Sequence, residues 1–136
     1  MSGASGSILA KKTIDTLLAF RIPVILVCSN DAKLVWKQEM HDDFSQVLSA
    51  WREDPNFSDY SIHEMTAPIA SGTFLASGMV VIPCSMSSAA SISLGISNNL
   101  LLRAADVCLK ERRSLILVPR ETPLHATHLE NLTRLA

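Results

Sequence analysis

Two adjacent charged residues, Arg120 and Glu121, stand between two prolines, directly after an apolar run. Proline holds its own φ near about −65° and restricts the residue before it, so the backbone is expected to be extended and stiff here. An arginine can bind a phosphate through two parallel hydrogen bonds, and a carboxylate can exchange protons. The two charges could also simply neutralise each other in a loop. Other residues of the chain must therefore distinguish a binding role from this alternative.

Two short turns rich in hydroxyl groups could bind an anion. Segment 2–7 (Ser-Gly-Ala-Ser-Gly-Ser) leads into a helical pattern, and segment 84–88 (Cys-Ser-Met-Ser-Ser) follows an apolar run and opens another helix. A helix N-terminus offers free N–H groups and positive dipole to a phosphate, and glycine allows close backbone approach. The alternative for each turn is an ordinary capped helix start.

Arg103 and Lys110 lie seven residues apart in a predicted helix and so share one face. Two cations on one face can receive a phosphate. Asp106 could instead pair with both and leave a solvated helix surface.

The three cysteines, Cys28, Cys84 and Cys108, lie in apolar runs without a CxxC pair or zinc-ligand spacing. We interpret them as buried thiols in a reducing cytoplasm and assign Cys84 no catalytic role. His125 and His128 match no zinc-ligand pattern, so we expect no metal site.

Composition limits the functional classes. The chain has 136 residues, of which 48% are hydrophobic and 18% charged, as expected for one globular domain. Its net charge of −1 and pI of about 6.4 argue against nucleic acid or an anionic membrane as partner. With no leader pattern and no apolar run near the roughly 18 residues that span a bilayer, we expect a cytoplasmic protein.

The elements that must position these residues follow from the hydrophobic pattern. Apolar runs at 22–29, 79–83 and 115–119 predict buried parallel strands, and a short strand is expected near 61–65. Helices are predicted over 5–20, 31–40, 43–51, 87–94, 100–112 and 126–135. This alternation predicts an α/β fold, a Rossmann-like or flavodoxin-like three-layer αβα domain with a mostly parallel sheet.

Both ends of the sequence differ from a complete domain of this type. The turn at 3–6 normally follows a strand, and the last predicted helix runs to the final residues. We therefore expect residues 1–136 to form a single domain that lacks its first strand and a C-terminal segment. Such a domain would expose apolar surface and self-associate.

Several blocks together resemble the UbiX-type flavin prenyltransferases. They are Ser-Gly-Ala-Ser-Gly at the start, Pro-Cys-Ser-Met from 83, Asn-Leu-Leu-Leu-Arg-Ala-Ala-Asp from 99, Val-Pro-Arg-Glu-Thr-Pro from 118 and His-Leu-Glu-Asn from 128. The resemblance implies an enzyme that moves a dimethylallyl group from dimethylallyl phosphate onto N5 and C6 of reduced FMN. It also implies a homo-oligomer, dodecameric or trimer-based, whose prenylated FMN serves a UbiD-type decarboxylase.

The resemblance also assigns site residues. FMN-binding positions are matched by Gly3, Ala4, Ser5, Ser29, Ser85, Met86, Ser87, Ser88 and Arg120. The active-site acid is matched by Glu121, and the other charged groups of the pocket by Glu39, Arg103 and Lys110. Ser87 departs from the pattern, since relatives commonly carry Lys or Thr there.

Two alternatives remain from the sequence. An FMN-dependent cysteine decarboxylase of the same class is disfavoured, because the Pro-x-Met-Asn-x-x-Met substrate signature is missing. A non-catalytic or impaired FMN-binding oligomer is the other alternative.

Overall fold

Helices and strands alternate along the chain in the computed structural model, which describes residues 1–136. In chain order the elements are α1 (Ser7–Ala19), β1 (Val24–Val27), α2 (Asn30–Glu39), α3 (Phe44–Arg52), β2 (Phe57–Tyr60), the short 3₁₀ helix η1 (Pro68–Ala70), β3 (Gly78–Cys84), α4 (Met86–Ser93), α5 (Leu100–Lys110), β4 (Ser114–Pro119) and α6 (Ala126–Leu135).

The predicted elements are largely confirmed. All six helices are present, with ends within two residues of the predicted ones, and three strands fall on the three apolar runs. The short strand expected near 61–65 was wrong in position, because β2 comes earlier, at Phe57–Tyr60. There Phe57 is buried and pairs with Val24 of β1, whereas residues 61–65 form turns beyond the strand.

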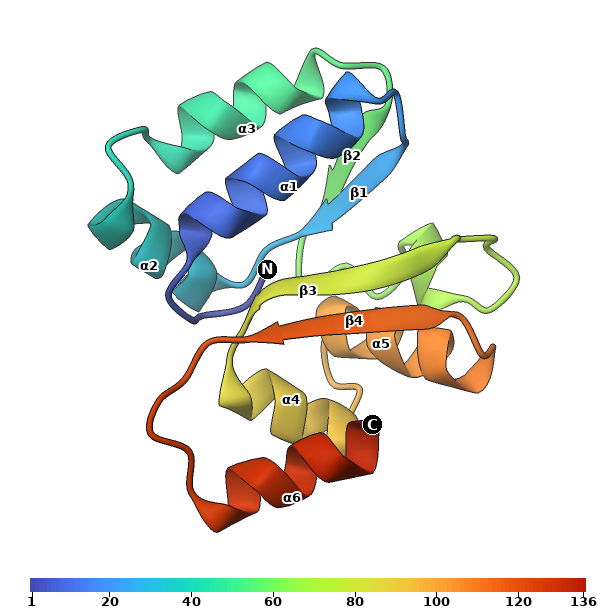
Figure 1. The fold of residues 1–136 in the computed structure, drawn as a ribbon. Coiled ribbons are helices and arrows are strands. Elements are labelled where there is room, and N and C mark those ends of the chain that lie inside the picture. Colours follow the sequence, from blue (N-terminus) through green and yellow to red (C-terminus); the bar gives the residue numbers. More distant parts are fainter.

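The strands form two parallel pairs, β1–β2 and β3–β4, and this confirms the predicted parallel arrangement. The first two residues lie between the pairs (Figure 1). The Met1 amino group donates to Val27 O at 2.8 Å and Ser29 N–H to Met1 O at 3.1 Å, while Ser2 N–H donates to Pro83 O at 3.2 Å. Residues 1–2 thus connect β1 to β3, which have no direct ladder between them.

Two apolar clusters fill the interior, each centred on one strand pair, although Val27 of β1 belongs to the cluster of β3–β4. Figure 1 shows α1, α2 and α3 grouped with β1–β2, and α4, α5 and α6 on the far side of β3–β4. In the first cluster Trp36 is only 1% exposed and makes edge-to-face contacts with Phe44 and Trp51. The second cluster packs α4 and α5 against β3, with Val81 and Leu100 completely buried.

Side-chain caps fix the starts of four helices, α2, α3, α4 and α5, and Asp43 is the cap of α3. Ser29 accepts a hydrogen bond from Ala32 N–H at the start of α2, Ser85 from Ser88 N–H at α4, and Asn99 from Leu102 N–H at α5. Ser29 comes two residues after β1 and Ser85 directly after β3, so these caps set two helix N-termini at the carboxyl edge of the strands.

Candidate functional site

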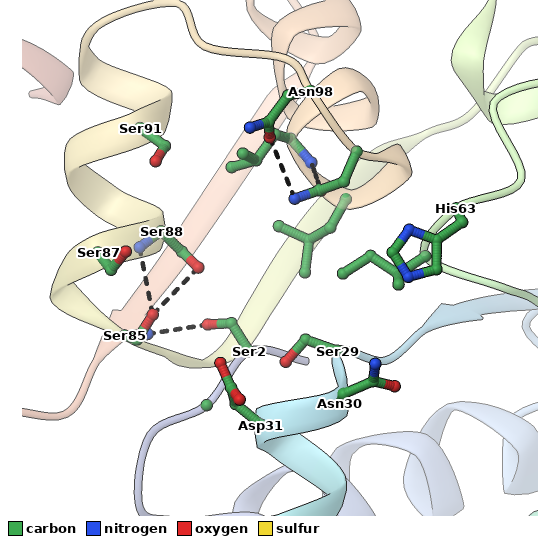
Figure 2. A pocket seen from close by; sticks show the side chains of 15 residues that line it. Ser2, Ser29, Asn30, Asp31, His63, Ser85, Ser87, Ser88, Ser91 and Asn98 are labelled. Atoms are coloured by element: carbon green, nitrogen blue, oxygen red, sulfur yellow. Dashed lines mark hydrogen bonds between the residues drawn. The ribbon is translucent and has the colours of Figure 1, made fainter.

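The capped starts of α2, α4 and α5 surround a cavity of about 510 Å³. Its lining is mostly polar, as Figure 2 shows, with six serines and three asparagines. The lining residues are Ser2, Gly3, Ser29, Asn30, Asp31, Ile62, His63, Ser85, Ser87, Ser88, Ser91, Asn98, Asn99, Leu101 and Leu102. The hydroxyls are linked, because Ser85 N–H donates to Ser2 Oγ at 2.9 Å and Ser85 Oγ lies 3.1 Å from Ser88 Oγ.

No lysine or arginine lines this cavity. Positive potential comes instead from the N-termini of α2, α4 and α5, whose capping residues all belong to the lining. Free N–H groups and hydroxyls at helix starts are suited to a phosphate ester and to polyol hydroxyls. The donor set therefore fits the ribityl phosphate of FMN, which these serines and helix starts would hold.

A second group of residues forms at the other end of the 2–7 turn. Gly6 N–H donates to Glu39 Oε1 at 3.1 Å and Oε2 at 2.9 Å, and Ser7 N–H donates to Oε2 at 2.8 Å. Gly6 has φ 112°, a left-handed conformation that favours glycine. A Cβ at Gly6 would lie 3.5 Å from Arg120 Nε, so the arginine packs against the same turn. The structure thus brings Glu39 and Arg120 together.

The surroundings of Glu39 favour its ionised form. Burial alone would raise the pKa of Glu39, but hydrogen bonds from Ser7 and Gly6 and the nearby charge of Arg120 outweigh burial and hold the pKa below its usual value. Glu39 is therefore a carboxylate at neutral pH, placed at the positive end of α1.

Glu39→Gln is expected to lower the free energy of unfolding by about 1 kcal/mol at neutral pH, a modest loss because the carboxylate is solvent-exposed. Since the folded pKa is depressed, this stabilisation is present above the unfolded pKa of about 4.3 and disappears as pH falls through the lower folded value. Urea denaturation of the wild-type protein and of Glu39→Gln at neutral and acidic pH measures the difference in their free energies of unfolding. If the difference in free energy of unfolding stayed constant down to strong acid, the stabilisation would not come from the ionised Glu39 carboxylate.

Glu121 follows β4 and is exposed, with a single local hydrogen bond from Thr122 N–H to its Oε1 at 3.1 Å. Its carboxylate has no ion-pair partner. Nothing in the fold requires the charge, so the proton-transfer role assigned to Glu121 remains a prediction that substitution can test cleanly.

Arg103 and Lys110 lie apart from the Glu39–Arg120 group. Arg103 Nε donates to Ala70 O at 3.0 Å and its Nη1 pairs with Asp106 at 2.8 Å, while Lys110 pairs with Glu111 at 2.6 Å. Ion pairing to Asp106 was the alternative left open from the sequence, and the structure shows it for Arg103. No hydrogen bond or ion pair connects either cation to the cavity within one chain.

The remaining predicted FMN positions divide by location. Gly3, Ser29, Ser85, Ser87 and Ser88 line the cavity. Ala4 and Met86 are buried, and Ser5 is exposed in the turn that joins the cavity to the Glu39–Arg120 group.

Ten lining residues were not among the predicted site residues, although Ser2 belongs to the 2–7 turn that the sequence marked as a possible anion site. They are Ser2, Asn30, Asp31, Ile62, His63, Ser91, Asn98, Asn99, Leu101 and Leu102. Asn99 could have been found as a helix cap before an apolar run, but His63 sits in an irregular segment that carries no such signal.

The three cysteines and the pair His125 and His128 do not line the cavity. Burial raises the pKa of the Cys84 thiol to about 11, so it is protonated at neutral pH and a poor nucleophile. His125 and His128 stack with ring centroids 3.5 Å apart, and no group of three His, Cys, Asp or Glu side chains could hold a metal ion. None of the helices has the length and apolar character needed to cross a membrane.

Comparison with known proteins agrees with this geometry. The model of the Flavoprotein family matches residues 1–136. Flavin prenyltransferase UbiX of Archaeoglobus fulgidus is 46% identical over 136 residues, covering 100% of this chain and 72% of the relative. The UbiX protein of Alkalihalophilus pseudofirmus is 40% identical over 141 residues, covering 100% of this chain and 70% of the relative.

Solved structures are similar over almost the whole chain. AnUbiX (PadA1), crystallised with FMN and dimethylallyl pyrophosphate, superposes with TM-score 0.91 at 41% identity, covering 99% of this chain and 69% of that one. A dodecameric FMN-dependent UbiX-like decarboxylase from Escherichia coli O157:H7 superposes with TM-score 0.89 at 36% identity, covering 99% and 74%. The chain therefore belongs to the Flavoprotein family, among its UbiX-type flavin prenyltransferases.

Proposed function

We propose that this protein binds FMN and transfers a dimethylallyl group from dimethylallyl phosphate to the reduced flavin. The observation that carries the proposal is the 2–7 turn, which joins two sites. One end of the turn lines a hydroxyl-rich cavity suited to a ribityl phosphate, and the other end meets Glu39 and Arg120. A structural relative that holds FMN and a dimethylallyl donor supports this reading.

The charged residues fit the chemistry of an allylic phosphate. When the allylic C–O bond breaks, negative charge develops on the departing phosphate, and the Arg120 guanidinium can stabilise it. Flavin supplies the carbon and nitrogen atoms that receive the prenyl group and must lose a proton. We propose that Glu121, which is exposed and without an ion pair, takes that proton.

Arg103 and Lys110 enter the proposal through a second copy of the chain. The start of α5 lines the cavity, and Lys110 ends the helix about 15 Å away at 1.5 Å per residue. Lys110 is therefore expected to meet reacting groups in the site of a neighbouring subunit. We propose the same for Arg103, which follows the cavity-lining Leu102 but whose guanidinium is held by Ala70 O and Asp106. The dodecameric relative supports a homo-oligomer.

The wider role follows from this reaction. Prenylated FMN would pass to a UbiD-type decarboxylase, since a modified flavin made by one enzyme must serve another. The three free cysteines favour the reducing cytoplasm as location.

The proposal is tested by incubating the purified protein anaerobically with reduced FMN and dimethylallyl phosphate, and in parallel with the pyrophosphate. Mass spectrometry should show flavin that has gained one five-carbon unit, and omission of the donor is the control. Bound FMN without any mass gain from either donor would reject prenyl transfer and leave a flavin-binding protein.

A further inference from the structure

Asp31 is the only acidic residue in the lining of the cavity. The lining contains no lysine or arginine, and its other ionisable side chain is His63. A ligand phosphate carries about −1.5 to −2 charges near neutral pH. A carboxylate in a phosphate-binding cavity without cations therefore opposes the ligand that the helix N-termini attract.

The position of Asp31 is fixed by its neighbours. It lies in the first turn of α2, and its Cβ and backbone pack against Gly3, where any added Cβ would collide with Asp31 Cβ. Figure 2 shows the carboxylate on the same side of the cavity as Ser2 and Ser85. The carboxylate makes no ion pair, so its charge is not neutralised by another side chain.

We propose that Asp31 limits the affinity of this site for the phosphate end of FMN, so that the flavin is exchanged as a substrate and not retained. The inference rests on the proposed function, in which flavin must enter unmodified and leave prenylated. Asp31 and the phosphate use the same positive helix end, since an acidic residue in the first turn already interacts favourably with the dipole of α2. The positive end of the α2 dipole therefore interacts with both the Asp31 carboxylate and the ligand phosphate, which repel each other.

The charge-removing variant Asp31→Asn tests this directly. Its Kd for FMN, measured by fluorescence quenching at low salt, should fall about three- to tenfold, as expected when a like charge several ångströms from the phosphate is removed. Riboflavin lacks the phosphate, so its Kd should not change. The gain for FMN should shrink at high salt, because screening weakens interactions between exposed charges.

Glu53→Gln is the matched control. Glu53 is also exposed and acidic, but it follows α3 before β2 begins, at the edge of the strands opposite the cavity. The change in net charge is the same, and we expect FMN affinity to stay at the wild-type value. Asp31→Ser provides a second variant that keeps a polar residue at the helix start, and thermal unfolding followed by circular dichroism verifies that each variant is folded.

The possible results distinguish a failure of the role of Asp31 from a failure of flavin binding itself. If wild-type protein binds FMN and Asp31→Asn binds it no more tightly, Asp31 serves only the N-terminus of α2 and the inference is overturned. Equal tightening toward riboflavin would overturn it as well, because the effect would not concern phosphate. Wild-type protein that binds neither flavin would reject the proposed function itself, and this inference with it.

Discussion

Replacing Glu121 by glutamine is expected to slow prenyl transfer by about 10²- to 10⁴-fold, the usual contribution of a positioned general acid or base. The amide has nearly the same shape but cannot take up a proton. Because the carboxylate is exposed and forms only one local hydrogen bond, the variant should fold normally and bind FMN with wild-type affinity. Single-turnover assays of flavin prenylation with saturating donor measure the chemical step directly.

Glu130→Gln is the control for this substitution, since Glu130 is an exposed carboxylate nearby in the chain, on α6. It should leave the rate unchanged. A Glu121→Gln enzyme that keeps full activity would show that another group handles the proton. Glu39 would then be the first candidate, because it is the other carboxylate close to Arg120.

Trp36→Ala is expected to cost about 3–5 kcal/mol of the free energy of unfolding, as for other large aromatic side chains removed from a core. Trp36 is 1% exposed, packs edge-to-face on Phe44 and Trp51, and donates from Nε1 to Asp42 O at 2.9 Å. The substitution removes all of these contacts and leaves a cavity. Urea denaturation followed by circular dichroism measures the loss in the free energy of unfolding.

The same substitution should also weaken FMN binding, because α2 reaches both parts of the site. The helix starts beside Ser29 at the cavity and ends at Glu39. Lys37→Ala, an exposed position on the same helix, should change neither stability nor affinity appreciably. A Trp36→Ala protein with wild-type stability would mean that α3 moves in to fill the cavity.

Most of the architecture could be predicted from the sequence because its signals are local. The run at 115–119 and the helix at 126–135 are marked by apolar periodicity and clear boundaries, and both elements formed where expected. The serines after β1 and β3 were found for the same reason, since a hydroxyl between a strand and a helix is a cap. The position of β2 was missed because its polar Ser58 and Asp59 hide the strand signal.

The spatial grouping of the site was harder to predict. Spacing alone suggested that Arg103 and Lys110 share a phosphate, but only the fold shows that α5 carries them away from Arg120. Asp31 and His63 reach the cavity through tertiary packing, and neither belongs to a recognisable motif. Residues brought together by long-range contacts leave no local pattern to read.

The bridging of the two strand pairs by residues 1–2 has a consequence for cooperativity. Each pair forms the centre of one apolar cluster, and few backbone hydrogen bonds join the two halves. A flavin in the cavity would contact both halves at once, through Ser29 on one side and Ser85 on the other. Its binding free energy would then add to the apolar packing that already links the two halves, through Val27 and Ile82, and would make their unfolding more cooperative.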